Sequence, residues 1–322
     1  SFSASSTLNF TVTDNSAESF TVKATKDTNP AVAGVSGLIT VNPDVEDHFV
    51  VLSASTPITV GAERLLQVRL EDQYNNAIPS ASVTFNTVLG SGYFGTPGAT
   101  TSVQSTNSSG VAEALYTASS STASVNDQIE VTINAVTETI TLPLQAGTVA
   151  YYEFTPSADQ NTTAGSGIAY TLTARDEFDN AVVNSDAVTL STPGSSTATF
   201  NTGTSVSFSV SSTLNFTVTD NTAGNFTVRA IKNINPAVNG ESGLITVGPD
   251  TEDHFVILSA VTPITVGNER LLQVRLEDQY NNAIPSASVT FNTVLGSGYF
   301  GTPGTTTSVQ STNSSGVAEA LY

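Results

Sequence analysis

The sequence predicts an all-β protein made of β-sandwich modules that are arranged end to end. Three observations lead to this prediction: apolar and polar residues alternate over short runs, turn-forming residues separate the runs, and long stretches of the chain recur. Alternation with period two is typical of half-buried strands, and no stretch shows helical spacing. Many short strands at regular intervals favour a sandwich over a parallel α/β sheet.

The alternating runs are rich in Leu, Val, Ile and Phe, with Thr at many of the positions between them, which suits strands. Gly, Pro, Asn and Ser cluster between the runs, as in GSGYFGTPG (90–98) and TNSSG (106–110), and these clusters predict turns. The clearest alternating runs lie at 8–12, 66–70, 129–133, 140–144 and 214–218.

The chain repeats itself at an offset of 206 residues. Residues 1–116 and 207–322 are identical at about 100 positions, which marks a tandem duplication. A fainter register at an offset of about 104 divides the repeat into two related modules, each about the size of an immunoglobulin-like sandwich. We name these modules A and B. The expected order is the C-terminal part of a B module (1–46), a complete A module (47–147), a complete B module (148–249) and the N-terminal part of a second A module (250–322).

One phrase occurs three times. EDQYNNAIPS (71–80) returns unchanged at 277–286, and RDEFDNAVVN (175–184) is a looser version. A strand is expected to end at Glu71–Asp72, with QYNN as the turn and AIPSASVTFN as the start of the next strand. Asn tolerates the left-handed conformation, which suits Asn75 or Asn76. Tyr74 is expected to fold back onto the end of the core, and each module is expected to need this same corner.

LEDQYNNAIPSASVTFNT (70–87), followed by STNSSGVAEALY (105–116), resembles the bacterial immunoglobulin-like repeats of invasin- and intimin-type surface proteins. Those repeats carry a D-x-x-G-N-P-like corner, a V-T-F strand and T-x-x-x-G-x-A; Asn75 stands here where Gly is usual. The resemblance spans nearly the whole chain. It implies immunoglobulin-like β-sandwich modules that form a stalk or extender segment of an extracellular cell-surface protein.

The charge and the missing residue types exclude several functions. The formal net charge is −19, so nucleic acid and anionic lipid are disfavoured as partners. No apolar run is long enough to cross a bilayer, so this segment is not expected to insert into a membrane. The chain has no Cys, which removes disulfides and Cys-based zinc sites.

The junctions from a B to an A module are rich in acids. Because the corner after the second strand of a sandwich lies beside the linker, five carboxylates are expected to meet at one pole. Ca²⁺ prefers about six to eight oxygen ligands, so we hypothesise that Ca²⁺ rigidifies these junctions; the alternative is a set of solvated turn acids. The acids are Asp44, Glu46, Asp47, Glu71 and Asp72 in the first copy, and Asp250, Glu252, Asp253, Glu277 and Asp278 in the second.

Catalysis is not expected, and the protein is interpreted as a non-enzyme. His48 and His254 are equivalent repeat positions, so they indicate linker residues and not a zinc ligand or a specialised base. Lys23, Lys26 and Lys232 are interpreted as solvated charges. Tyr93–Phe94 and Tyr151–Tyr152 would suit sugar stacking, but one member of each pair is expected in a core.

The sequence thus indicates a spacer or filament segment of an extracellular fibre, stalk or adhesin. Its partners would be neighbouring modules or subunits of the same fibre. The alternative is an adhesion module whose loops bind glycan or a host or cell-surface protein. The partial modules at both ends indicate a window from a longer array, or subunits that complete each other by strand exchange.

Overall fold

The structure is a computed structural model that describes residues 7–322. It divides into two compact units. The first runs to Gly147 and also contains Phe178–Asn180, and the second contains Thr148–Glu177 and Ala181–Tyr322. A and B remain the names of the segments defined by the sequence repeats, and the predicted module boundaries stay a prediction.

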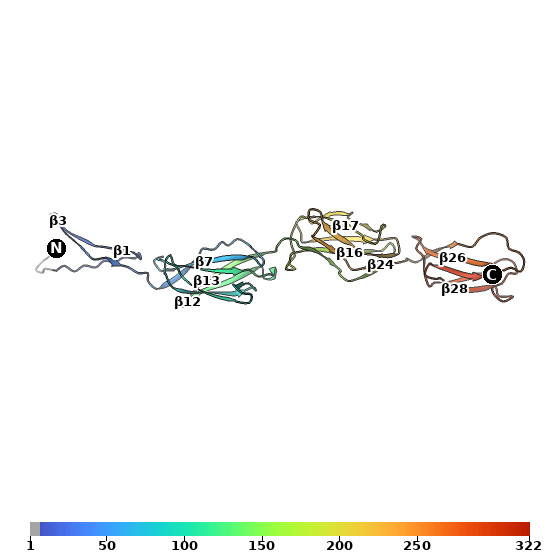
Figure 1. The fold of residues 1–322 in the computed structure, drawn as a ribbon, viewed down its shortest axis with the longest axis horizontal. Coiled ribbons are helices and arrows are strands. Elements are labelled where there is room, and N and C mark those ends of the chain that lie inside the picture. Colours follow the sequence, from blue (N-terminus) through green and yellow to red (C-terminus); the bar gives the residue numbers. More distant parts are fainter. Residues whose placement is uncertain (1–6) are drawn as a thin grey trace. The chain divides into compact units, whose positions relative to one another are not determined.

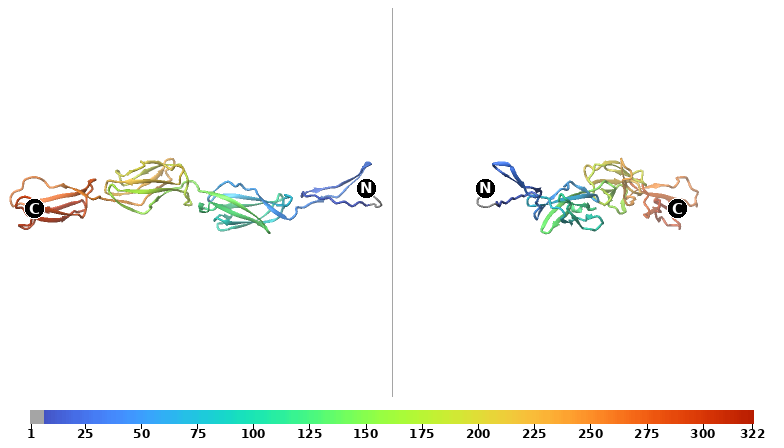
Figure 2. Two further views of the ribbon diagram at one scale, coloured as in Figure 1. Left: turned by 180° about the vertical axis from the view of Figure 1, so that it is seen from behind. Right: turned by 60° about the vertical axis from the view of Figure 1, so that its left-hand side comes forward.

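The A module of the first unit is a two-layer sandwich. One sheet has the order β10-β8-β12-β13-β6 and the other the order β5-β7-β11-β9, which confirms the all-β sandwich prediction. The labels β7, β12 and β13 mark this module in Figure 1, and Figure 2 shows it from two other sides. The elements are β5 (Glu46–Val51), β6 (Ile58–Thr59), β7 (Glu63–Asp72), β8 (Ser82–Leu89), β9 (Tyr93–Phe94), β10 (Thr101–Ser105), β11 (Val111–Thr117), the short 3-10 helix η1 (Thr122–Ser124), β12 (Asn126–Ile133) and β13 (Val136–Gln145).

The core of this module follows the alternation in the sequence. Leu66, Val68 and Leu70 of β7 are fully buried, whereas the neighbouring Leu65 is half exposed. Successive side chains on a strand point to opposite faces, so one apolar set fills the space between the sheets. Of the first aromatic pair, Phe94 is buried against Tyr116, with ring centroids 5.0 Å apart, as predicted for one member of the pair.

Two details of the first corner differ from the prediction. The strand after the corner begins at Ser82 and not at Ala77. Pro79 has no N–H to donate, Ser80 has a φ of 60°, and Thr106 bonds the segment instead: its hydroxyl donates to the Ile78 carbonyl and accepts the Ala81 N–H. Tyr74 does not fold onto the core, because its side chain is 46% exposed.

The segment before the first A module forms two small hairpin sheets. β1 pairs with β4 and β2 with β3, and nearly all their side chains are exposed. The repeat-equivalent segment of the second unit keeps these pairings but adds a half-buried strand at 213–219, which pairs with 167–173 and with 199–200 of the B module. The elements are β1 (Ser19–Phe20), β2 (Lys23–Lys26), β3 (Asn29–Val35) and β4 (Ile39–Thr40).

The B module of the second unit packs three small sheets around an aromatic core. The sheet orders are β14-β16-β20-β18, β19-β17-β22-β23 and β15-β24-β21, and Figure 1 labels β16, β17 and β24. The ring centroids of Phe154, Tyr170 and Phe216 lie within 6.2 Å of one another. The ring of Tyr152 stacks on that of Phe208. The strands are β14 (Tyr151–Thr155), β15 (Gln160–Thr163), β16 (Gly167–Arg175), β17 (Ala187–Ser191), β18 (Thr199–Phe200), β19 (Ser205–Ser207), β20 (Thr213–Thr219), β21 (Gly224–Phe226), β22 (Arg229–Lys232), β23 (Asn239–Glu241) and β24 (Ile245–Gly248).

Lys232 is not the solvated charge that the sequence suggested. Its ammonium lies 2.7 Å from the Asp186 carboxylate, and both side chains are less than one-fifth exposed. The pair joins the end of β22 to the residue before β17, because the two strands are neighbours in one sheet.

The second A segment repeats the front of the first A module. β25, β26 and β29 form one sheet, and β27 pairs with β28. Among the described residues no helix has the length and apolar character needed to span a membrane. The strands are β25 (Glu252–Ile257), β26 (Leu271–Asp278), β27 (Ser288–Asn292), β28 (Thr307–Ser311) and β29 (Val317–Leu321).

Candidate functional site at the module corners

The three copies of the repeated phrase form the same compact corner, which we define as residues 72–76, 176–180 and 278–282. In the first corner the Asn75 N–H donates to the Asp72 carbonyl and the Asp72 N–H to the Asn76 carbonyl, so the chain reverses over three residues. Asn75 has a φ of 64°, as predicted for the left-handed position. This is the geometry of a three-residue hairpin loop, and Asn here replaces the usual Gly.

The carboxylate of Asp72 organises this corner from the inside. It is fully buried. One oxygen accepts the N–H groups of Tyr74 and Asn76, each at 2.9 Å. The other accepts the side-chain amide of Asn76 and the N–H of Asp44, also at 2.9 Å. Asp278 makes the same four bonds at 2.8–2.9 Å, and Asp176 is likewise fully buried.

These bonds keep Asp72 and Asp278 ionised. Burial by itself would raise the pKa of Asp72. Hydrogen bonds from the Asn76 side chain and from the N–H groups of Asp44, Asn76 and Tyr74 outweigh burial and lower the pKa to about 2. The pKa of Asp278 is also lowered, since the Asn282 side chain and the N–H groups of Asp250, Asn282 and Tyr280 outweigh its burial.

The corner also holds the linker that enters the A module. Asp44 lies in this linker; its N–H donates to Asp72, and its own carboxylate accepts the Gln73 amide at 2.9 Å. The second copy repeats both contacts through Asp250, Asp278 and Gln279, each at 2.8 Å. The predicted proximity of linker and corner is therefore present, through hydrogen bonds.

Glu71 has an arginine and a histidine beside it, two partners that the sequence reading missed. Its carboxylate is 3% exposed; it contacts the Arg69 guanidinium, and the His48 Nε2 lies 3.2 Å away. His48 Nδ1 in turn lies 3.1 Å from Asp47. Arg69 and Glu71 are two residues apart on one strand and so face the same side, which is a signal that the sequence does contain. The second copy repeats this network with Asp253, His254, Arg275 and Glu277.

The junction acids fit a calcium ion poorly in this arrangement. Glu46 lies across the sheet from Asp72 but accepts a hydrogen bond from the Asn134 side chain, which lowers the pKa of Glu46. Glu252, its repeat counterpart, lies across from Asp278. In residues 7–322 no group of three or more acidic or imidazole side chains is placed to share a metal ion. Calcium binding at these junctions stays a prediction.

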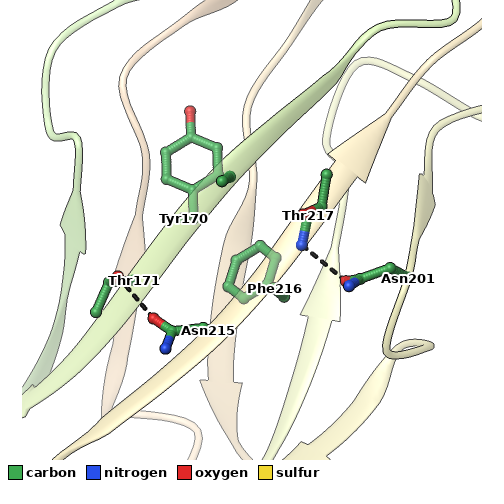
Figure 3. A pocket seen from close by; sticks show the side chains of 7 residues that line it. Tyr170, Thr171, Asn201, Asn215, Phe216 and Thr217 are labelled. Carbon is green, nitrogen blue, oxygen red and sulfur yellow. Dashed lines mark hydrogen bonds between the residues drawn. The ribbon is translucent and has the colours of Figure 1, made fainter.

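A shallow groove of about 230 Å³ lies on the B module. Figure 3 shows its polar side chains. The Thr171 hydroxyl donates to the Asn215 carboxamide oxygen, and the Thr217 N–H to that of Asn201, both at 2.7 Å. Tyr170 and Phe216 lie beneath and belong to the core. The groove has no carboxylate or imidazole among its lining residues, and its amides and hydroxyls suit a neutral polar ligand.

Comparison with known proteins identifies similar folds. No known family and no curated protein matches the chain. Among solved structures, the FdeC adhesin of Escherichia coli is 17% identical, with a TM-score of 0.49 over 87% of this chain and 90% of that chain. InvD of Yersinia pseudotuberculosis is 17% identical, with a TM-score of 0.44 over 85% of this chain and 83% of that one. Invasin, a bacterial integrin-binding protein, is 12% identical, with a TM-score of 0.38 over 84% of this chain and 53% of invasin. The solved structures that are similar to this chain thus include bacterial surface proteins of the invasin type, the class that the repeated phrase resembles.

Proposed function

We propose that this chain is a structural repeat segment of an extracellular, adhesin-type surface protein, in which it acts as a spacer. The observation that carries the proposal is the linker held by the corner. At each B-to-A junction a buried aspartate of the A module accepts the N–H of a linker residue, Asp44 in one copy and Asp250 in the other. A connection that is bonded at its middle has less conformational freedom than an open loop.

The connections are also short. β4 ends at Thr40 and β5 begins at Glu46; β24 ends at Gly248 and β25 begins at Glu252. Few residues remain between the strands to absorb a change in direction, so the bonded linker favours a restricted range of module orientations.

Duplication supports the same function. The corner, its linker contact and the Arg–Glu–His network all recur at an offset of 206 residues. A catalytic site works as a single specialised copy, whereas the reach of a spacer grows with every copy added. The sequence resemblance to invasin- and intimin-type repeats supports the surface location.

Small-angle X-ray scattering of the chain in solution tests the spacer function. We expect the profile of an extended particle whose maximum dimension is insensitive to salt, because the linker N–H donates to an aspartate that is itself buried. A compact profile, or one that collapses when salt is added, would contradict the proposal.

A glycan- or protein-binding adhesion module is the second candidate, and the groove beside Asn201 and Asn215 favours it. Binding to a glycan array that is lost in Asn215→Ala would support this function. Flat isotherms for the wild type and the variant, together with extended scattering, would support the spacer.

A further inference from the structure

The side chain of the last corner residue reaches beyond its own module. Asn282 donates from Nδ2 to the carbonyl of Asn221 and accepts the N–H of Ala223 at Oδ1, both at 2.8 Å. Asn221 and Ala223 lie in the turn after β20, in the preceding B module. The contact therefore joins two modules that follow one another within the second unit.

The first unit contains the same two-bond contact twice. Asn76 donates to the Asn15 carbonyl and accepts the Ala17 N–H, both at 2.8 Å. Asn180, which belongs to the first unit, donates to the Ser120 carbonyl at 2.8 Å and accepts the Thr122 N–H at 2.9 Å. We call residues 15–17, 120–122 and 221–223 the receiving turns. The contact is thus common to A and B modules, although their sequences differ at these turns.

A carboxamide fits a receiving turn because it offers a donor and an acceptor in one plane, matched to a carbonyl and an N–H two residues apart. The corner aspartate fixes the direction of this amide. Asn282 Nδ2 also donates to Asp278 at 2.9 Å, so one amide hydrogen faces the aspartate and the other the preceding module. Asn282 is 8% exposed and Asn180 is 7% exposed, so these bonds are shielded from water.

Two of the receiving turns, 120–122 and 221–223, are braced by a buried aspartate of their own module. In the B module Asp220 is buried and accepts the Thr222 N–H together with the hydroxyls of Ser195 and Thr197. In the A module the buried Asp127 accepts the N–H and the hydroxyl of Ser119. The acceptor and donor that meet the asparagine are therefore held in place by the module that carries them.

An aromatic residue of the corner covers a glycine beside the receiving turn. A Cβ added to Gly165 would lie 2.2 Å from the Tyr280 hydroxyl oxygen, and one added to Gly61 would lie 2.7 Å from the Phe178 ring. The N–H groups of both glycines donate to the carbonyls of the residues just before the receiving turns, Asp220 and Ser119. Turn and glycine thus form one surface with space for the aromatic ring.

We propose that this surface is a module-to-module docking site whose partner is the corner of the next module, and that the corner asparagine is its specificity-determining residue. Docking orders the joint between consecutive modules, of either type, without a metal ion or a covalent bond. The role of docking in ordering the array rests on the proposed spacer function. The docking geometry itself is argued only from the hydrogen bonds and side-chain contacts described above.

The absence of Cys from the sequence allows a direct test. Spin labels on Cys introduced at Ser205 of the B module and at Ser311 of the following A segment, both exposed in the structure, report the inter-module distance by pulsed electron paramagnetic resonance. We expect one narrow distance peak in the full chain. Asn282→Ala should lose this peak in favour of a broad distribution, and Asn282→Asp should do the same because it lacks the donor.

Asn292→Ala, an exposed strand position of the same A segment, is the matched control and should keep the narrow peak. An unchanged distribution in Asn282→Ala, with a circular dichroism spectrum equal to that of the wild type, would overturn the docking proposal. If the distance distribution is unchanged in Asn282→Ala but the scattering profile is that of an extended particle, the docking proposal is wrong and the spacer function is still supported. Glycan binding with a narrow distance peak would reject the spacer and keep the docking site.

Discussion

Asp72 and Asp278 show how one side chain can hold a joint together. Each carboxylate has four donors, two from its own corner, one from the linker and one from the asparagine that contacts the preceding module. An asparagine at this position would place an NH₂ group against two of those donors. A buried donor that loses its partner costs about 1–3 kcal/mol.

Asp278→Asn should therefore lower the free energy of unfolding by about 2–6 kcal/mol, since two buried donors lose their acceptor at about 1–3 kcal/mol each. Chemical denaturation monitored by circular dichroism measures this change. Glu269→Gln removes one negative charge at an exposed position of the same A segment and is the control. Equal stability of the two variants would show that charge, and not the bonding of Asp278, decides the result.

Acid should weaken the same corners. The pKa of Asp72 is about 2 in the folded protein against an ordinary value of 3.8. A lowered pKa contributes stability that is present above 3.8 and is lost as the pH falls through the folded value. The free energy of unfolding should thus decrease between about pH 4 and pH 2, and less steeply in Asp72→Asn. Parallel pH profiles for variant and wild type would contradict this.

At the scale of elements, one stretch of sequence folds in two ways. TLNFTVT occurs at 7–13, where it is not a strand, and at 213–219, where it is β20. β20 lies between β16 and β18, and no strand pairs with described residues 7–13 in the first unit. Tertiary partners, and not propensity, decide whether this segment becomes a strand.

Phe216→Ala should therefore cost about 3–5 kcal/mol, because it empties a site in the aromatic core. Phe10→Ala changes the same residue of the repeat, which is 66% exposed, and should cost less than about 0.5 kcal/mol. Thermal and chemical unfolding of the two variants give this comparison. Similar losses for both would mean that Phe10 is buried in solution.

The glycine loops allow a second matched comparison. Gly165 has a φ of 81° and lies under Tyr280, whereas Gly203 has a φ of 78° with open space around its Cα. Alanine costs about 1–2 kcal/mol at either position through left-handed strain. Gly165→Ala should cost more and shift the NMR signals of Tyr280. Identical costs and an unmoved Tyr280 would argue against contact between the modules.

Much of this organisation can be predicted from the sequence, because period-two alternation and turn residues act locally. The end of β7 at Asp72 and the left-handed Asn75 are examples. The role of Asn76 was missed since its partners at 15 and 17 lie in another module, about 60 positions away. The prediction that Tyr74 folds onto the core of its own module is wrong, and its counterpart Tyr280 instead covers a glycine of the preceding module.

At the scale of the whole molecule, the net charge is −19, and the fold places a hydrogen-bond or ion-pair partner beside several of the junction acids. Glu71 has Arg69 and His48, Glu46 has Asn134, and Asp44 has Gln73. Side chains already engaged in this way have few oxygens left for a hard cation.

A calcium titration distinguishes the two accounts of the junctions. The donors in the structure predict that Tm is the same in calcium and in chelator. The calcium hypothesis from the sequence predicts a higher Tm with calcium in the wild type but not in an Asp72→Asn, Asp278→Asn variant. Differential scanning calorimetry measures both, and magnesium controls for ionic strength.

The direction of the asparagine contacts has a consequence for biosynthesis. In all three copies the receiving turn precedes the asparagine in the chain, as Asn221 precedes Asn282. During synthesis the ribosome therefore produces each receiving turn before the asparagine that binds it. The docking contact of a module forms only after the next module has been made. The docking contacts of such an array therefore form one after another from the N-terminal end. The contact nearest the ribosome is the last to become ordered.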